Sequence, residues 1–147
     1  MNIKKEGRIN VIGLVIAGHG VWPTAMKKTA EMIVGDISYI QTVEIDNIES
    51  AESIKQKIDN AITALEDVDG IIILLDLFGG SPSHAAVSFA NNPNICAITG
   101  ANVGMLLEIM MARQASDIDD LCEVAIKAGH NAINNLFATI RSHMEGA

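Results

Sequence analysis

The sequence predicts an α/β fold, a three-layer sandwich in which helices cover both faces of a mainly parallel sheet. Short apolar runs alternate with longer stretches whose apolar residues recur every three or four positions. Two of the runs, Ile9–Ala17 and Gly70–Leu75, are almost continuously apolar, which is typical of strands buried on both faces. Strands that alternate with helices form βαβ units, so we expect a parallel sheet.

The first half of the chain supplies three strands and two helices. The strand at 9–17 is followed by a helix at 22–34, which carries an apolar stripe and ends at Gly35. A second strand is expected at 39–45. The helix at 49–65 has acidic residues in its first turn, where the helix dipole favours them. The third strand is the run 70–75.

The second half begins with a helix from Ser81 to about residue 90, with Ser81 as N-cap and Pro82 at the first helical position. A short strand is expected at 95–99, and a helix capped by Asn102 at 102–113. A capping box, Ser116-x-x-Asp119, predicts the start of another helix. The tail after residue 129 is compatible with a continued helix or with an edge strand within 131–140.

Length and composition limit the classes of function. With 147 residues we expect a single domain, 1–147. The formal net charge of −8 argues against a nucleic-acid binder, which would carry a basic face. No segment approaches the roughly 18 apolar residues of a membrane span, so we expect a cytoplasmic protein without membrane insertion. Cys96 and Cys122 lack C-x-x-C spacing and are expected to be free thiols in a reducing cytosol.

Topology predicts where a site would form. The common strand order for so short a chain is 2-1-3-4, in which the helices after strands 1 and 3 leave on opposite faces. Ligands bind in the crevice between such strands, at their carboxyl ends. Gly18-His19-Gly20 follows the first strand, and the segment Asp76 to Ser81 follows the third. We therefore expect His19 and Asp76 to lie together.

His19 is the candidate nucleophile because its flanking glycines leave the approach to the ring open. The alternative is a histidine that only caps a strand end. A carboxylate after five apolar residues would be costly if buried without a partner, and a histidine ring N–H would satisfy Asp76. That bond would fix the tautomer and leave Nε2 free. Backbone N–H groups of the following turn are the alternative partners of Asp76.

The turn Gly79-Gly80-Ser81 offers backbone N–H groups and a hydroxyl at a helix start, an arrangement that binds phosphate or carboxylate. It is also an ordinary loop-to-helix junction. No Walker A motif is present, so ATP is not the obvious phosphoryl source. The histidines have no metal-ligand spacing, and neither a metal nor a cofactor is expected. His84 either lines the same crevice or faces solvent.

Three motifs in this order resemble the mannose-type enzyme IIA of the bacterial sugar phosphotransferase system. They are Gly18-His19-Gly20, the segment 75–82 (LDLFGGSP) and the segment 99–113 (TGANVGMLLEIMMAR). The resemblance covers about residues 8–129. It implies that His19 accepts a phosphoryl group from the carrier protein HPr and passes it to a histidine of enzyme IIB, as a phosphotransferase in sugar uptake.

The resemblance also implies a role for each site residue. Asp76 would orient the ring, while Ser81 and the nearby backbone N–H groups of Gly20, Gly79 and Gly80 would hold the phosphoryl oxygens. Family members are typically homodimers with an antiparallel C-terminal strand, which favours a strand within 131–140.

Two positions depart from the family pattern: Gly18 replaces a frequent hydroxyl residue, and Phe78 stands where a tryptophan can occur. No IIB domain follows, so we expect IIB to be a separate chain. Three other functions remain open. They are the phosphotransfer subunit of dihydroxyacetone kinase, a regulatory module phosphorylated by HPr, and a domain that binds a small anion directly.

Overall fold

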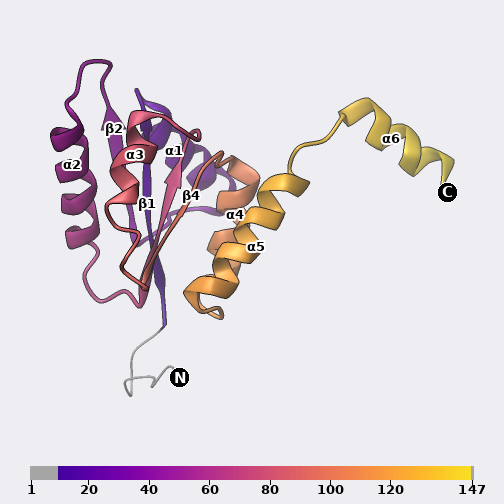
Figure 1. Cartoon of the computed structure of the whole chain (residues 1–147). Helices are drawn as coiled ribbons and strands as arrows, with labels where there is room; N and C mark the ends of the chain where they lie inside the picture. The colour runs from indigo at the N-terminus through magenta and orange to yellow at the C-terminus, as the bar shows by residue number, and fades with distance from the viewer. Residues whose placement is uncertain (1–9, 147) are drawn as a thin grey trace.

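The computed structural model describes residues 10–146 and places four parallel strands in one sheet (Figure 1). The strands are β1 (Ile12–His19), β2 (Ile40–Ile45), β3 (Gly70–Leu75) and β4 (Ile95–Ile98), in the spatial order β2-β1-β3-β4. The predicted fold class and strand order are confirmed. The start of the first predicted strand, at Ile9, lies outside the described residues.

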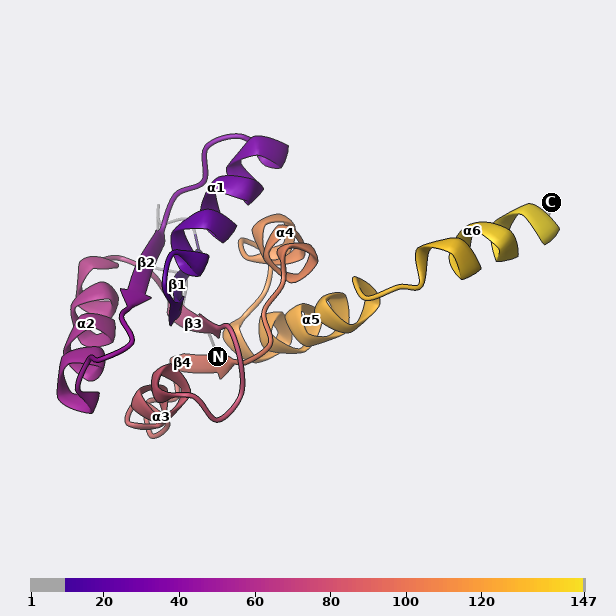
Figure 2. The same ribbon diagram turned by 90° about the horizontal axis from the view of Figure 1, so that it is seen from above.

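Helices cover both faces of the sheet, which makes the three layers seen in Figure 2. Those of the described chain are α1 (Trp22–Val34), α2 (Ala51–Ala64), α3 (Ser81–Val87), α4 (Val103–Ala112), α5 (Ile118–Asn131) and α6 (Leu136–Glu145). Helices α1, α4 and α5 pack on one face, and α2 and α3 pack on the other. The helices after β1 and β3 therefore leave on opposite faces, as predicted.

Each face of the sheet has its own apolar core. Alternate residues of β1 point to opposite faces, so Leu14 and Ile16 join one core while Val15 and Ala17 join the other. All four are fully buried. Burial on both faces explains why β1 and β3 are almost continuously apolar in sequence. It also makes the two central strands a rigid base for the loops that follow them.

Two helix starts differ from the prediction. The N-cap of α3 is Gly80, so Ser81 is the first helical residue and makes no side-chain capping bond. The N-cap of α5 is Asp117, whose carboxylate accepts a hydrogen bond from the Asp120 N–H, so the predicted capping box is one residue out of register. The Ser116 hydroxyl instead donates to the Ala112 carbonyl at the end of α4. Both sites offered two adjacent capping residues, and local spacing alone did not separate them.

The expected antiparallel edge strand within 131–140 is wrong for this structure. Asn131 ends α5, a short connection follows, and α6 begins at Leu136. Asn135 caps α6 by accepting from the Ala138 N–H. No residue of α6 is buried, and the helix projects away from the body of the molecule (Figures 1 and 2). A strand needs a neighbouring strand to pair with, and α6 lies far from the β4 edge.

Two further expectations concern the state of the cysteines and the presence of a membrane-spanning helix. Cys96 of β4 and Cys122 of α5 form a disulfide across one core, so the expectation of free thiols is wrong. Nothing in their sequence spacing indicated this pairing, because the contact depends on how α5 packs on the sheet. Within residues 10–146, no helix combines the length and the apolar character needed to cross a membrane.

Candidate active site

The ends of β1 and β3 bring His19 and Asp76 into direct contact. The two strands pair in register up to Ala17 and Leu75, so the residues that follow emerge side by side. Asp76 Oδ2 lies 2.7 Å from His19 Nδ1 and also accepts a hydrogen bond of 2.8 Å from the His19 backbone N–H. Asp76 Oδ1 accepts a third bond, of 2.9 Å, from the Leu77 N–H. Both of the predicted partners of Asp76, a ring nitrogen and backbone N–H groups, are therefore present.

These contacts keep Asp76 ionised. Partial burial acts to raise the pKa of this carboxyl. The hydrogen bonds from the backbone and ring of His19, and from Leu77, act in the opposite direction and outweigh burial, so the pKa of Asp76 lies below its ordinary value. An ionised carboxylate can only accept hydrogen bonds, so Nδ1 of His19 carries the proton.

The far side of the His19 ring is open. Because Nδ1 carries the proton, Nε2 of the neutral ring holds a lone pair. In the described part of the chain no hydrogen bond engages Nε2. The His19 side chain is 44% exposed, whereas that of Asp76 is only 14% exposed. The pair thus presents a nucleophilic nitrogen to the surface while its orienting carboxylate is held inside.

The turn before α3 borders the same ring. A Cβ placed on Gly80 would lie 3.2 Å from His19 Cε1, so glycine lets this turn approach the imidazole closely. Gly79 has φ +86°, a conformation that favours glycine. Ser81 is exposed at the first position of α3, where backbone N–H groups have no partner within the helix. The predicted Gly79-Gly80-Ser81 turn therefore lies beside the imidazole.

The other residues near the site play different parts. The Gly20 N–H already donates to the Ile45 carbonyl at 2.9 Å, so it is not a free donor for an anion. Gly20 also has φ +60°, and a Cβ there would meet nothing within 4 Å, which leaves the approach to His19 open. His84 is exposed on α3, and its backbone N–H donates to the Gly80 carbonyl. Trp22, which the sequence pattern assigned only to a helix, lies beside the same space as Asp76, because a Cβ on Gly18 would lie 2.6 Å from Trp22 Cε3 and 2.9 Å from Asp76 Oδ2. The one sequence signal for it is an aromatic residue directly after the histidine loop.

Comparison with known proteins assigns this chain to a family. The profile of the EIIA-man family, described as "PTS system fructose IIA component", matches residues 13–126. The chain belongs to the EIIA-man family. The family description and the relatives of this chain name components of sugar-specific PTS systems.

Two EIIA-man relatives illustrate the match. The fructose-specific EIIA component of Bacillus subtilis is 30% identical over 112 residues, which cover 76% of this chain and 77% of that protein. The mannose-specific EIIAB component of Escherichia coli is 31% identical over 129 residues, or 86% of this chain. The chain spans only 40% of that longer protein.

A solved EIIA structure agrees with the fold. The PTS IIA protein associated with the fucose utilization operon of Streptococcus pneumoniae superposes with a TM-score of 0.81 at 25% identity. The superposition covers 90% of this chain and 98% of that one.

Proposed function

We propose that this protein is a cytoplasmic phosphocarrier, formed by residues 1–147 as one mannose-type IIA domain. His19 accepts a phosphoryl group from phosphorylated HPr and passes it to a histidine of an enzyme IIB. The observation that carries the proposal is the 2.7 Å contact between His19 Nδ1 and Asp76, which leaves an exposed ring with Nε2 free. This is the arrangement that a histidine nucleophile with an orienting carboxylate requires.

In this proposal the chemistry is a transfer between nitrogens. The Nε2 lone pair of His19 attacks phosphorus as the bond from phosphorus to the donor histidine breaks. The electron pair of the broken bond returns to the donor nitrogen. The His19 ring becomes positively charged because it keeps the Nδ1 proton. Asp76 stabilises that charge across the hydrogen bond. A nitrogen of the IIB histidine then attacks the phosphorus, the bond from phosphorus to Nε2 breaks with its electron pair returning to Nε2, and the His19 ring is neutral again.

The phosphoryl oxygens also need donors. We assign this role to the exposed Ser81 hydroxyl and to the backbone N–H groups of Gly79, Gly80 and Ser81. The closeness of Gly80 to His19 Cε1 supports the assignment, because it places this turn within reach of a group on Nε2. Gly20 contributes access rather than a hydrogen bond, since its N–H is already engaged.

The rim of the site suits docking of a protein. Exposed apolar side chains follow three of the strands at the same edge of the sheet: Val21 (71% exposed), Ile48 (96%), Leu77 (48%) and Phe78 (85%). Apolar and aromatic side chains are the usual anchors of protein interfaces. We propose that HPr and IIB dock in turn on this rim, which a deep pocket around His19 would prevent.

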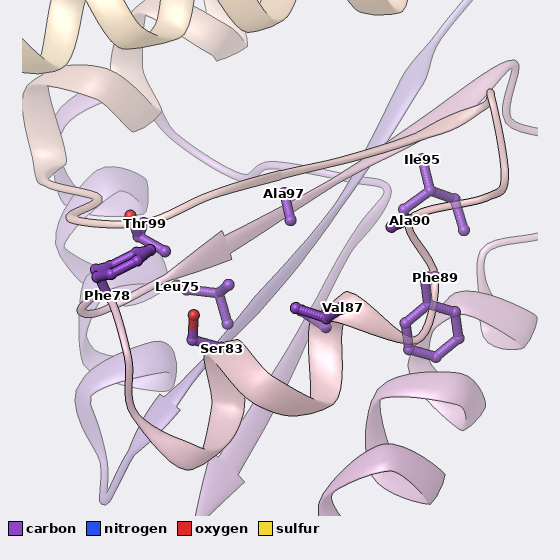
Figure 3. A pocket seen from close by; sticks show the side chains of 10 residues that line it. Leu75, Phe78, Ser83, Val87, Phe89, Ala90, Ile95, Ala97 and Thr99 are labelled. Carbon is purple, nitrogen blue, oxygen red and sulfur yellow. The ribbon is translucent and has the colours of Figure 1, made fainter.

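We also propose a homodimer, in which α6 packs against a second copy. Its exposed apolar side chains fall at helical spacing on one stripe: Leu136, Phe137, Ile140 and Met144. A ten-residue helix is marginal in water unless tertiary packing supports it. Next to the edge strand β4 lies an apolar counterpart, a cavity of about 460 Å³ whose lining includes Leu75, Phe89 and Ile95 (Figure 3).

The test is phosphorylation by the donor system. The protein is incubated with labelled phosphoenolpyruvate, enzyme I and HPr, and the acid-labile phosphate is measured. We expect wild type to be labelled and His19→Ala to remain unlabelled, while His84→Ala, a matched exposed histidine beside the site, is labelled normally. Label on His19→Ala would refute the assignment of His19. Subsequent addition of a IIB protein should remove the label from wild type.

A further inference from the structure

Gly18 is a glycine because its neighbours already fill the space beside its Cα. A Cβ built on Gly18 would lie 2.6 Å from Trp22 Cε3 and 2.9 Å from both Cγ and Oδ2 of Asp76. Real Cβ atoms essentially never approach other heavy atoms so closely. The backbone does not explain the glycine, since Gly18 is not among the positive-φ glycines of the described chain. The indole ring and the carboxylate therefore border one small space next to His19.

The indole ring is held in place from the other side. Trp22 is the first residue of α1, and its partly buried side chain packs against the core that includes Met26 and Ala30. The ring cannot retreat from the site without disturbing that packing. The indole therefore forms a fixed side of the small space at Gly18 that the Asp76 carboxylate also borders.

The hydrogen bonds of the Asp76 carboxylate depend on its staying in one orientation. The oxygen that borders the space, Oδ2, is the atom that accepts both bonds from His19. If the carboxylate rotates, or if water enters beside it, the bond to Nδ1 lengthens and weakens. A bulky apolar neighbour restricts rotation and excludes water at the same time.

We propose that Trp22 is a positioning residue for phosphoryl transfer, which holds Asp76 against the His19 ring in the space that Gly18 leaves open. The inference rests on the proposed function of His19 as phosphoryl acceptor. It also explains why Gly18 stands where family members often have a hydroxyl residue. In this chain the indole of Trp22, from the following helix, occupies the volume that such a side chain would fill.

The first test is a set of variants at both positions, assayed for the initial rate of phosphoryl transfer over a range of phospho-HPr concentrations. Trp22→Ala should lower the maximal rate about tenfold and change KM less than about twofold, because the ring acts on Asp76 and not on the docking rim. Trp22→Phe keeps an aromatic wall and should stay within about threefold of wild type.

The combination of the two positions is the sharper test. Gly18→Ala alone should be slower than Trp22→Ala, because its methyl group collides with the ring and displaces Asp76. Adding Trp22→Ala to Gly18→Ala removes the shortest of these contacts, the one of 2.6 Å with the indole, so the double variant should transfer phosphate at least about threefold faster than Gly18→Ala. Purely additive losses would overturn the proposal.

A second measurement does not depend on phosphoryl transfer. The Nδ1 proton of His19 should give a low-field proton NMR signal that is protected from exchange with water in wild type. Trp22→Ala should increase its exchange rate about tenfold or more, while Trp22→Phe should preserve the protection. Failure of wild type to accept phosphate would refute the proposed function, but this signal would still decide the role of Trp22.

Two controls separate positioning from general destabilisation. Ile62→Ala shortens a partly buried apolar side chain on the opposite face of the sheet, and Gly13→Ala adds a methyl group to the same strand as Gly18, 3.1 Å from Leu65. Both should lower the melting temperature but leave the rate and the Nδ1 signal unchanged. The role of Trp22 is refuted if Trp22→Ala keeps the wild-type rate and proton exchange, or if the controls reproduce its losses at equal melting temperature.

Discussion

Replacing Asp76 by asparagine tests the chemistry of the site most directly. The side chain keeps its size and one acceptor oxygen, but it loses the negative charge that faces Nδ1 at 2.7 Å. One asparagine orientation places an NH₂ group against the His19 donors, and the other places it against the Leu77 N–H. At least one of the three hydrogen bonds of Asp76 is therefore lost in either orientation.

The structure sets the size of the expected effect. The bond from the His19 backbone is present before and during transfer, so it does not change the barrier. The ring bond becomes charged on both sides as phosphate arrives, and a hydrogen bond to a charged group contributes about 1.5–3 kcal/mol. Since about 1.36 kcal/mol is a factor of ten in rate, Asp76→Asn should slow transfer roughly 13- to 160-fold.

The assay is rapid-quench transfer of labelled phosphate from phospho-HPr at pH 7. A matched control is Asp69→Asn at the opposite end of the sheet, where the carboxylate also accepts from a backbone N–H, that of Val11 at 2.9 Å. The control should transfer at the wild-type rate. An Asp76→Asn rate within about twofold of wild type, in a folded protein, would show that the carboxylate does not stabilise the charged ring.

Three further predictions address pH, docking and assembly. Burial raises the pKa of Asp76, but its hydrogen bonds outweigh this effect and hold the pKa in the folded protein below the ordinary 3.8. The ionised carboxylate therefore stabilises the folded state above pH 3.8, and this stabilisation is lost as the pH falls through the folded-state pKa. Urea unfolding should therefore show wild type more stable than Asp76→Asn at pH 7 and a smaller difference at pH 3; an equal difference at both would contradict the shift. Phe78→Ser should raise KM for phospho-HPr about fivefold or more with little change in maximal rate, whereas Val87→Ser, an exposed apolar control on α3, should not; an unchanged KM would remove Phe78 from the rim. Leu136→Glu together with Phe137→Glu should convert a dimer to a monomer in sedimentation equilibrium, while Met32→Glu on α1 should leave the dimer intact. A dimer that survives both α6 substitutions would mean that α6 does not form the interface.

The core of the site could be predicted because it depends on topology. Once β1 and β3 are recognised as adjacent parallel strands, the residues after their carboxyl ends must emerge together, and these are His19 and Asp76. The details depend on atoms that topology does not place. The bonding of the Gly20 N–H to Ile45, and the N-cap role of Gly80 in place of Ser81, follow from the local path of each loop.

The sequence by itself determined the alternation of strands and helices, the strand order and the two loops of the site. These features follow from apolar periodicity and turn residues, which act over a few neighbouring positions. Tertiary structure alone decided that residues after Asn135 form a projecting helix, that Cys96 meets Cys122, and that the Trp22 ring fills the space at Gly18. Such contacts join residues from different elements, and their distances are set by how whole helices pack on the sheet.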